Sequence, residues 1–441
     1  MSQQATIIKK ALEQLKIEAL NPMQTAALAA FQQPGDLMLL SPTGSGKTLA
    51  FLLPVLLQLD PNQTGVQTLI LAPTRELALQ IETVFREMST GYKVNCFYGG
   101  HDFKTEKNSL QHPPAVLIGT PGRITDHLEK GSLDPVSIRM LVLDEFDKSL
   151  EFGFEPEMKY IITRLPNLKK RMLTSATELK EIPSFTGLKQ VQKLNYLAED
   201  AVPSGLEVKT VAADGPDKTE TLLSLLGVIG NEATIVFCNH REALERISTF
   251  LKRYKVTHDL YHGKLEQEER ERALIKFRNG SNLILVTTDL AARGLDISQV
   301  RHVVHYQLPV NEQSFIHRNG RTARMNAEGT AYLIMSPKET VPPYISSEPE
   351  AMELPDTLEL PAAPEWTTVY IGAGKKEKVN KVDIVGWLLQ KGKLEKSELG
   401  MINVGDHISY AAVNSSKVKE MLQLVRAEKL KTKAVKIDIA R

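Results

Sequence analysis

The sequence predicts two parallel-sheet α/β domains in tandem, followed by a small α+β domain. Short, nearly continuous apolar runs alternate with longer helical patterns between residues 36 and 175. The same alternation repeats between residues 206 and 336, and a basic segment with another pattern follows from residue 366. Such alternation is typical of parallel sheets that are covered by helices on both faces.

Domain 1 is expected at residues 1–198. Its apolar runs are rich in leucine and β-branched residues and do not alternate with polar residues, so each strand should be buried on both faces. The expected strands are Leu37–Leu40, Thr68–Ala72, Ala115–Gly119, Met140–Asp144 and Arg171–Ser175.

Domain 2 is expected at residues 206–336, with Ala198–Gly205 as its connection to domain 1. Residues 337–365 contain seven prolines, seven acidic residues and one lysine, so their charge is 1 − 7 = −6. Because proline lacks a backbone donor and favours extended chain, this segment predicts a semi-rigid linker. The expected strands of domain 2 are Thr234–Cys238, Leu283–Thr287, Val300–Tyr306 and Thr330–Met335.

Residues 366–441 form the third expected unit. They hold fifteen Lys or Arg and eight Asp or Glu, for 15 − 8 = +7. Their strand, helix, strand, strand, helix, strand order suits an RRM-like sandwich of helices on a sheet. The expected elements are Thr368–Gly372, Lys381–Gln390, Met401–Val404, His407–Val413, Ser416–Arg426 and Ala434–Ile439.

Composition excludes several other classes of protein. The 441 residues are 42% hydrophobic and 24% charged, which is ordinary for a globular chain. Two distant cysteines, Cys96 and Cys238, provide neither a zinc site nor a disulfide framework and are expected to be buried thiols. Neither a secretory signal nor an apolar stretch of membrane-spanning length is visible, so we expect a cytoplasmic protein without membrane partners.

The segment Ser41–Thr48, which reads SPTGSGKT, follows an expected buried strand and opens an apolar helix. This is the context of a P-loop, in which backbone N–H groups of a glycine-rich turn bind phosphate oxygens. Lys47 should contact the β- and γ-phosphates of ATP, and Thr48 should bind Mg²⁺. Ser41 stands where the strictest pattern has glycine. The expected nucleotide-binding residues of this loop are Thr43, Gly44, Ser45, Gly46, Lys47 and Thr48.

Two carboxylates, Asp144 and Glu145, end an apolar strand downstream of the P-loop. Asp144 can hold Mg²⁺, and Glu145 can orient and deprotonate the attacking water. In domain 2, residues 317–324 read HRNGRTAR. Permanently charged guanidinium groups at this spacing suit the phosphate charge of a transition state.

These motifs, in this order, resemble the DEAD-box helicases of superfamily 2, whose core has two RecA-like domains. The resemblance covers about residues 1–340. Further matches are Asn21-Pro-Met-Gln24 (Q motif), Pro73–Ala78 (motif Ia), Gly99-Gly100 (GG), Thr120-Pro-Gly-Arg123 (motif Ib), Ser175-Ala-Thr177 (motif III), the region from His262-Gly263 through Gln267 to Arg270, and Thr288-Asp289 through Asp296 (motif V).

The resemblance implies that ATP and RNA close the two domains on each other and that the closed form bends one RNA strand. Gln24 would then read the adenine edge and Asp296 the ribose of ATP, while Arg321 and Arg324 would act as arginine fingers. Contacts to the RNA backbone do not read its sequence. The implied RNA contacts are Arg75, Gly100, Thr120, Arg123 and Thr288.

The C-terminal unit resembles the RNA-binding domain of DbpA-type bacterial helicases, through Val369–Lys378, Asp383–Gly386 and His407–Val413. That group acts on ribosomal RNA in large-subunit assembly, so RNA and pre-ribosomal particles are the implied partners. Tyr370 and Tyr410 lie on the strands that carry stacking aromatics in RRM folds, but such residues often only pack the sheet. The expected phosphate contacts are Lys375, Lys376 and Lys378.

Four positions depart from the family pattern. The tetrad reads Asp144-Glu145-Phe146-Asp147, with phenylalanine in place of alanine, and we expect the larger ring to find room beside motif III. Asn319 and Ala323 replace the common isoleucine and glycine of the HRNGRTAR motif. Ile17 stands where an aromatic residue usually stacks on adenine.

Two functions from different classes therefore stay open. The first is a monomeric enzyme that unwinds or remodels structured RNA, and the second is an ATP-dependent RNA clamp with little productive unwinding. Intact hydrolysis residues favour the enzyme, and Phe146 keeps the clamp as an alternative. A DNA helicase is not expected, because the basic C-terminal unit favours RNA.

Overall fold

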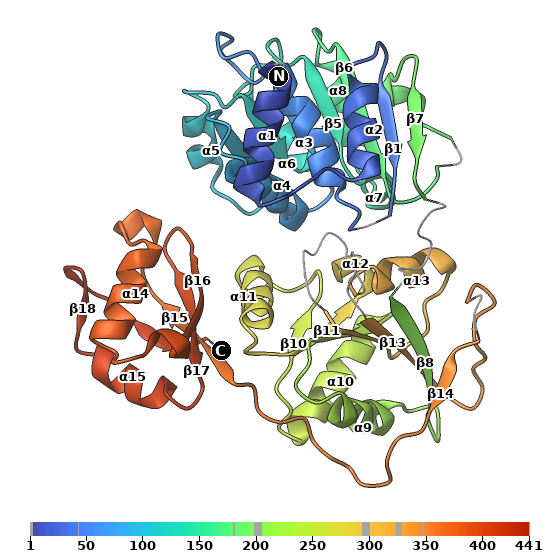
Figure 1. Ribbon diagram of the computed structural model, residues 1–441, viewed down its shortest axis with the longest axis vertical. Helices are drawn as coiled ribbons and strands as arrows, with labels where there is room; N and C mark the ends of the chain where they lie inside the picture. The colour runs from blue at the N-terminus through green and yellow to red at the C-terminus, as the bar shows by residue number, and fades with distance from the viewer. Residues whose placement is uncertain are drawn as a thin grey trace. The chain divides into compact units, whose positions relative to one another are not determined.

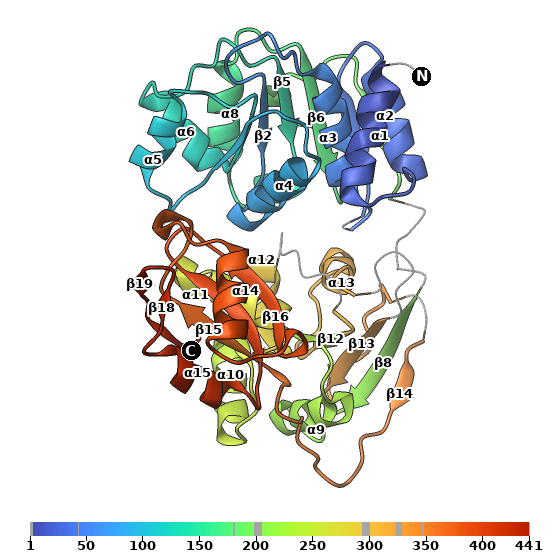
Figure 2. The same ribbon diagram turned by 60° about the vertical axis from the view of Figure 1, so that its left-hand side comes forward.

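The computed structural model describes residues 3–42, 44–179, 181–197, 205–292, 300–322, 329–345 and 348–440. The described residues up to 197 form one compact unit, and those from Gly205 onward form a second. The first unit is domain 1, and the second contains domain 2 and the C-terminal domain (Figures 1 and 2). The predicted fold class, two parallel-sheet domains and a small antiparallel one, is confirmed.

Within its described residues, domain 1 has a seven-stranded parallel sheet in the order β3-β4-β2-β5-β6-β1-β7. All residues of β1, β2, β4 and β5 are buried, as their continuous apolar runs predict. The strands are β1 (Leu37–Leu40), β2 (Thr68–Leu71), β3 (Val94–Phe97), β4 (Val116–Gly119), β5 (Met140–Leu143), β6 (Lys170–Ser175) and β7 (Gln192–Asn195).

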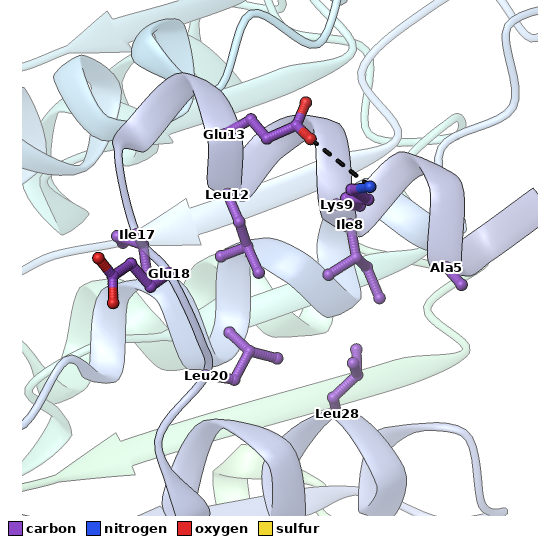
Figure 3. Close-up of a pocket in the computed structure, with 9 residues that line it drawn as sticks. All are labelled: Ala5, Ile8, Lys9, Leu12, Glu13, Ile17, Glu18, Leu20 and Leu28. Carbon is purple, nitrogen blue, oxygen red and sulfur yellow. Dashed lines mark ion pairs between the residues drawn. The ribbon is translucent and has the colours of Figure 1, made fainter.

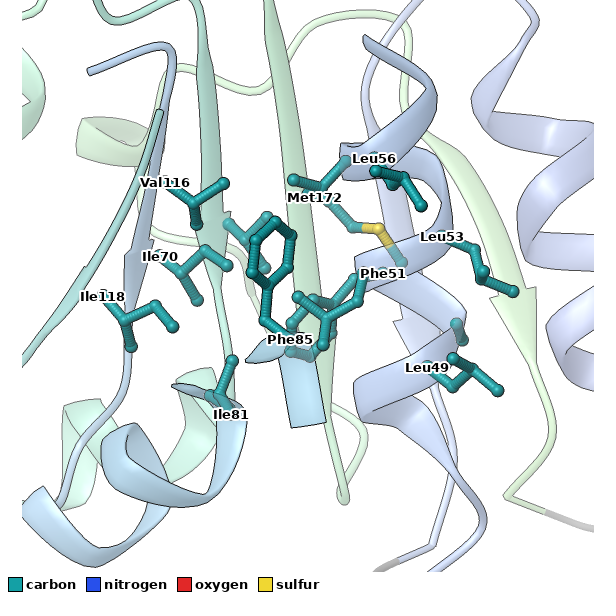
Figure 4. Close-up of a cluster of buried hydrophobic side chains, with 14 of the residues drawn as sticks. Leu49, Phe51, Leu53, Leu56, Ile70, Ile81, Phe85, Val116, Ile118 and Met172 are labelled. Atoms are coloured by element: carbon teal, nitrogen blue, oxygen red, sulfur yellow. The ribbon is translucent and has the colours of Figure 1, made fainter. Parts of the chain in front are cut away.

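Two hydrophobic cores cover the two faces of this sheet. Alternate residues of β1 enter opposite cores: Leu39 joins the core under α1 to α4, whereas Leu40 joins the core under α6 and α8. Phe51 and Phe85 meet in the first of these cores (Figure 4). The helices are α1 (Gln3–Leu15), α2 (Pro22–Phe31), α3 (Lys47–Gln58), α4 (Arg75–Glu87), α5 (Phe103–Ser109), α6 (Pro121–Glu129), α7 (Phe146–Glu151) and α8 (Glu155–Thr163), with the short 3-10 helix η1 (Ser184–Thr186).

Helices α1 and α2 enclose an apolar pocket of about 500 Å³ on the surface of domain 1 (Figure 3). Leu12 and Leu28 line it from the two helices, and Lys9 and Glu13 form an ion pair at its rim. Ile17, the expected neighbour of adenine, also lines this pocket and packs against the first core.

Domain 2 repeats the architecture, with the parallel order β10-β11-β9-β12-β13-β8-β14 among its described residues. The main core of this domain lies between the sheet and helices α9 and α10. Its elements are β8 (Leu206–Ala212), α9 (Thr219–Ile229), β9 (Thr234–Cys238), α10 (Arg241–Arg253), β10 (Asp259–Tyr261), α11 (Gln267–Arg278), β11 (Ile284–Thr288), α12 (Asp289–Ala292), β12 (His302–His305), α13 (Glu312–Asn319), β13 (Gly329–Met335) and β14 (Glu350–Met352).

The acidic, proline-rich segment 337–365 is packed on domain 2 along much of its length. Its strand β14 pairs with β8 at the edge of the sheet, and Met352 and Leu354 pack against the core. The ring of Tyr344 lies 6.0 Å from that of Phe315 on α13. The backbone of Glu359 lies so close to Gly227 that a side chain at Gly227 would overlap it.

The C-terminal domain has the antiparallel sheet β16-β17-β15-β20, covered on one face by α14 and α15. Its strand and helix order matches the predicted RRM-like order, with one additional small hairpin. The elements are β15 (Trp366–Ile371), η2 (Lys375–Glu377), α14 (Lys381–Gln390), η3 (Lys396–Glu398), β16 (Leu399–Val404), β17 (Ser409–Asn414), α15 (Val418–Val425), β18 (Lys429–Leu430), β19 (Lys433–Ala434) and β20 (Ile437–Ile439).

The open face of this sheet contacts domain 2 at the C-terminal end of α11. Thr368 Oγ1 accepts a hydrogen bond from Asn279 Nδ2 (3.1 Å) and lies 2.6 Å from Ser281 Oγ, with all three residues buried. Tyr410 pairs across the strands with Tyr370, and burial raises the pKa of the Tyr410 hydroxyl. These contacts hold the C-terminal domain against domain 2.

Among the described residues, no helix has both the length and the apolarity needed to cross a membrane. Cys238 is buried, and burial raises the pKa of its thiol to about 12, so this thiol stays protonated at neutral pH. Burial likewise raises the pKa of Cys96. The expectation of two buried thiols is therefore confirmed for Cys238, whereas Cys96 is only partly buried.

Candidate functional site

The candidate residues of domain 1 follow the carboxyl ends of its parallel strands. Strands β5, β6 and β1 are neighbours in the sheet, so the loops after them lie side by side. They carry Asp144 and Glu145, the Ser175–Thr177 segment, and the P-loop. Strands β3, β4 and β2 form the other half of the same edge and are followed by Gly100, Thr120 and Arg75. A parallel sheet thus collects both groups of residues at one edge.

The glycine-rich loop turns sharply and opens α3. Gly44 and Gly46 adopt φ angles of 87° and 89°, which residues with a side chain rarely adopt. Lys47 is buried, and its Nζ donates to the carbonyl oxygens of Ser41 (2.5 Å) and Pro42 (2.9 Å). The ammonium group is thereby held within the loop at the N-terminus of α3, where backbone donors favour phosphate. Thr43 lies outside the described residues.

Ser41, the departure from the P-loop pattern, is accommodated by a hydrogen bond. The Ser41 hydroxyl donates to Ser45 Oγ (2.6 Å), which in turn donates to the Pro42 carbonyl (2.8 Å). The side chain is almost fully buried, so a hydroxyl without a partner would be costly there.

The Q motif contacts this loop directly. Gln24 Nε2 donates to the Gly46 carbonyl (3.2 Å), and Asn21 Nδ2 donates to the Ser45 carbonyl (3.0 Å). Asn21 and Gln24 also form a capping box at the start of α2, which fixes both side chains. A ligand at Gln24 would therefore be linked to the phosphate-binding loop through one side chain.

Asp144 and Glu145 are buried at the end of β5. Asp144 accepts hydrogen bonds from the Thr174 hydroxyl and from the Glu145 backbone N–H (3.1 Å). Burial raises the pKa of Asp144, while Thr174 and the nearby Lys47 oppose that rise. Glu145 has φ 44° and ψ 52°, a left-handed conformation that a residue with a side chain adopts at an energetic cost. Strain of this kind concentrates at functional sites.

Phe146 is fully buried in the second core of domain 1, and its nearest ring neighbour is Phe185 on η1, with centroids 6.2 Å apart. The next tetrad residue, Asp147, accepts a hydrogen bond from the Thr177 hydroxyl (2.8 Å). The ring thus packs against Phe185, and motif III is joined to the tetrad through the neighbouring Asp147.

The residues predicted to contact RNA in domain 1 are close together. The Arg75 guanidinium lies 4.9 Å from the centre of the Tyr98 ring and against Gly100. Gly100 has φ 88° and belongs to the turn that follows β3. Thr120 begins α6, and Arg123 lies in the first turn of that helix. Glu106, which the sequence analysis missed, joins this group through Arg123.

In domain 2, the first arginine of the HRNGRTAR motif is structural. Arg318 is buried and binds Asp289 through two hydrogen bonds, Nε to Oδ1 (2.5 Å) and Nη2 to Oδ2 (2.8 Å). It also donates to Asn239 Oδ1 and to the Gln307 carbonyl. This network joins α13 to α12, the short helix that directly follows β11. Arg321 is buried after α13, and Asp296, Ala323 and Arg324 lie outside the described residues.

Asn319, a departure from the family pattern, has a specific partner. Its Oδ1 lies 3.0 Å from Nε2 of His305, which is fully buried on β12. Burial, with a smaller contribution from Arg318, lowers the pKa of His305 to about 3. His305 is therefore neutral at physiological pH, and its Nε2–H donates to Asn319.

Because His305 stays neutral when folded, domain 2 is expected to lose stability as pH falls below about 6.5, the pKa of histidine in an unfolded chain. Between this pH and the folded pKa of about 3, only the unfolded chain takes up the proton, so unfolding becomes easier by about 1.4 kcal/mol per pH unit. Urea unfolding between pH 7.5 and 5 should show a shallower pH dependence for His305→Gln. The same change at the exposed His240 should leave the slope unaltered, and equal slopes in both variants would contradict this assignment.

Three comparisons bear on the family. The family model of the DEAD/DEAH box helicase matches residues 21–183, the helicase conserved C-terminal domain matches 217–326, and the DbpA RNA binding domain matches 368–439. A curated relative, ATP-dependent RNA helicase DbpA of Escherichia coli, is 32% identical over 97% of this chain and 96% of its own length. The chain belongs to the DEAD-box helicases.

A second relative agrees with this chain in length, and two solved structures agree with it in fold. ATP-dependent RNA helicase DbpA of Bacillus subtilis is 29% identical and aligns with 98% of this chain and 97% of its own. The structure of Saccharomyces cerevisiae Dbp5 bound to RNA and ADP BeF3 superposes with a TM-score of 0.70 at 25% identity, over 80% of this chain and 94% of that one. The structure of Mss116p bound to ssRNA and AMP-PNP superposes with a TM-score of 0.66 at 27% identity, over 76% of this chain and 73% of that one.

This DEAD-box chain is thus an ATP-dependent RNA helicase with an RNA-dependent ATPase activity. The structure brings together Gln24, the P-loop and Asp144 and Glu145 at one half of the sheet edge, and Arg75, Gly100, Thr120 and Arg123 at the other. The structure also identifies three residues that hold predicted site residues in place: Thr174, which bonds to Asp144, Glu106, which bonds to Arg123, and Arg318, which bonds to Asp289. No local sequence signal marks Glu106, because its helix reads as a polar surface segment, FKTEKNS.

Proposed function

We propose that this helicase uses ATP to unwind or remodel structured ribosomal RNA locally during assembly of the large ribosomal subunit. The observation that carries this proposal is the shared sheet edge in domain 1. ATP-binding residues follow β1, β5 and β6, and the candidate RNA contacts follow β2, β3 and β4 of the same sheet. A change at one half can therefore reach the other through two adjacent strands, β5 and β2.

The residues of the ATP site have separable roles. Lys47 neutralises charge on the β- and γ-phosphates, and Gln24 reads the adenine edge while it holds the P-loop at Gly46. Glu145 orients the attacking water and accepts its proton. Closure of the two domains is proposed to bring Arg321 and Arg324 to the γ-phosphate, where such arginines raise rates by about 10³-fold or more.

The residues also fit Mg²⁺. Asp144 is a buried carboxylate whose desolvation raises its pKa, so a bound cation would stabilise its charged form. Thr48 provides a hydroxyl oxygen at the start of α3, and hard oxygen donors of this kind are those that Mg²⁺ prefers. When bound, Mg²⁺ would neutralise negative charge on the phosphate oxygens.

The choice of RNA is assigned to the C-terminal domain. Lys375, Lys376 and Lys378 are exposed on the η2 turn, which backbone hydrogen bonds to Gly405 and Asp406 hold in place. By contrast, Thr368 on the sheet face contacts domain 2, and Tyr410 on the same face is half-buried. The lysine turn is therefore the better candidate for contact with RNA. The resemblance of the C-terminal domain to the RNA-binding domain of DbpA-type helicases supports ribosomal RNA as the target.

Replacing Lys375, Lys376 and Lys378 by glutamine is expected to remove the preference for ribosomal RNA and to leave stimulation by generic RNA unchanged. Losing up to three phosphate contacts should also make binding less sensitive to salt: the slope of the logarithm of the binding constant against the logarithm of salt concentration should become less negative by about 2. The control replaces Lys391, Lys393 and Lys396 by glutamine, which removes the same charge. These lysines follow the C-terminal end of α14, whose length separates them from the lysine turn by about 15 Å. A triple variant that prefers ribosomal RNA as strongly as the control would contradict the assignment.

The experiment that tests the whole proposal measures the ATPase rate with no RNA, generic RNA, ribosomal RNA and DNA. We expect stimulation by RNA but not by DNA, and the strongest stimulation by ribosomal RNA. A flat, slow rate with every nucleic acid would overturn the proposal and favour the alternative, an ATP-dependent clamp in which Phe146 limits turnover.

A further inference from the structure

We propose that Glu106 is a positioning residue that holds the RNA-contacting surface of domain 1 in its binding shape. This inference rests on the proposed function, since it takes Arg123 and the Gly99-Gly100 turn as RNA contacts. Glu106 itself is 1% exposed, so it can act only through its neighbours.

The Glu106 carboxylate has partners from two other segments of the chain, α6 and the turn after β3. Arg123 Nε donates to Oε2 (2.6 Å), and His127 Nε2 lies 2.9 Å from the same oxygen. The backbone N–H of Tyr98 donates to Oε1 (3.3 Å). A carboxylate only accepts, so the His127 tautomer must carry its proton on Nε2. One buried charge thus joins α5, α6 and the end of β3.

The segment 98–101, which contains Gly99-Gly100, is held at both ends by this arrangement. At its start, Tyr98 donates to Glu106; at its end, the carbonyl of His101 accepts from Arg123 Nη2 (2.5 Å). Because Glu106 binds Nε of the same guanidinium, it sets the direction in which Arg123 reaches this turn. The Arg123 side chain is only 11% exposed and is correspondingly restrained.

Aromatic rings hold the two side-chain partners of Glu106, His127 and Arg123. The His127 ring stacks between Phe97 and Phe103, with centroid distances of 4.7 and 4.3 Å. The Arg123 guanidinium lies 5.1 Å from the centre of the Phe103 ring. His127 is fully buried and also meets Ser132 Oγ at 2.8 Å through Nδ1. The carboxylate therefore faces partners that cannot easily rotate away.

Removing the carboxylate should release Arg123, because a buried guanidinium without its acceptor is driven toward water. The turn would then lose both of its anchors at once. Glutamine can substitute in part: its carbonyl oxygen, placed where Oε2 lies, accepts from both Arg123 and His127, whereas its amide nitrogen replaces Oε1 and loses the hydrogen bond from the Tyr98 N–H. The conservative variant should therefore restore much of what leucine removes.

The test uses the full chain with Glu106→Leu, Glu106→Gln and the control Asp36→Leu. Asp36 is a buried carboxylate at the opposite end of the same sheet, where it accepts from the backbone N–H groups of Arg171 and Lys189, each at 2.7 Å. Glu106→Leu is expected to raise the RNA concentration that gives half-maximal ATPase activity about tenfold, because the variant loses one charge-assisted contact with RNA. The ATP KM and the rate at saturating RNA should stay within about twofold, and Glu106→Gln should recover most of the RNA affinity.

If Glu106→Leu fails to fold, the double variant Glu106→Leu/Arg123→Met replaces the ion pair by apolar groups of similar volume. It should need no more RNA than Arg123→Met alone, because Glu106 acts through Arg123. A wild-type chain that RNA does not stimulate would defeat the proposed function. RNA stimulation that Glu106→Leu leaves unchanged, or weakens only as much as Asp36→Leu does, would overturn the positioning role alone.

Discussion

Glu145→Gln is expected to lower RNA-stimulated ATP hydrolysis by about 10²- to 10⁴-fold, the usual contribution of a general base. Glutamine keeps the size of the side chain and its hydrogen-bonding oxygen, but it cannot accept the proton of the attacking water. Because Lys47 and Gln24 are untouched, ATP and RNA should still bind. The measurements are the steady-state ATPase rate at saturating RNA and the affinity for an ATP analogue that is not hydrolysed.

The matched control is Glu151→Gln, in the last turn of α7, the short helix that begins directly after Glu145; the Glu151 carboxylate pairs with Lys148 at 2.9 Å. It should retain nearly the wild-type rate. A Glu145→Gln variant that hydrolyses ATP within about threefold of this control would remove Glu145 as the base, since so small a loss is far below the expected range.

Phe146→Ala is expected to destabilise domain 1 by about 3–5 kcal/mol, the usual cost of deleting a buried aromatic side chain. The ring is fully buried and contacts Phe185, so its loss leaves a cavity beneath η1. Phe146 also directly follows the strained Glu145. We therefore expect the ratio of ATP hydrolysed to RNA unwound to change as well. Urea unfolding and a paired ATPase and unwinding assay measure the two effects.

Phe51→Ala is the control that separates a loss of stability from a change in the ratio of ATP hydrolysed to RNA unwound. Phe51 is equally buried in domain 1 but belongs to the other core, away from the tetrad. It should cost similar stability and leave the ratio of hydrolysis to unwinding unchanged. If Phe146→Ala changed neither ATPase nor unwinding, Phe146 would have only a packing role.

Much of the core could be predicted because its strands are apolar throughout. Thr234–Cys238 and Lys381–Gln390 have the same limits in the sequence analysis and in the structure. The P-loop and the Asp144-Glu145 pair were recognisable because each directly follows such a strand. In contrast, β7 and β14 alternate or expose their residues and have no apolar run. Their pairing at a sheet edge supplies backbone partners that local pattern does not reveal.

The residues that only the tertiary structure could identify are buried polar groups with distant partners. Phe146 was visible as a departure, but its contact with Phe185 was not. Asn319 was also visible as a departure, but its hydrogen-bond partner was not: this partner is His305 on β12, fourteen residues earlier in the chain. The segment 337–365 was predicted as a semi-rigid linker because proline favours extended chain, and the structure adds that backbone pairing and Tyr344 attach it to domain 2.

By itself, the sequence determined the fold class and the family and predicted the residues of ATP hydrolysis, because apolar periodicity and motif spacing are local properties of a chain. The structure alone decided that Glu106, Arg318 and Thr368 are buried and which partners each has. A polar side chain becomes stable inside a protein only when other groups satisfy its charge or hydrogen bonds. Those groups come from elements far apart in the chain, so only the folded arrangement specifies them.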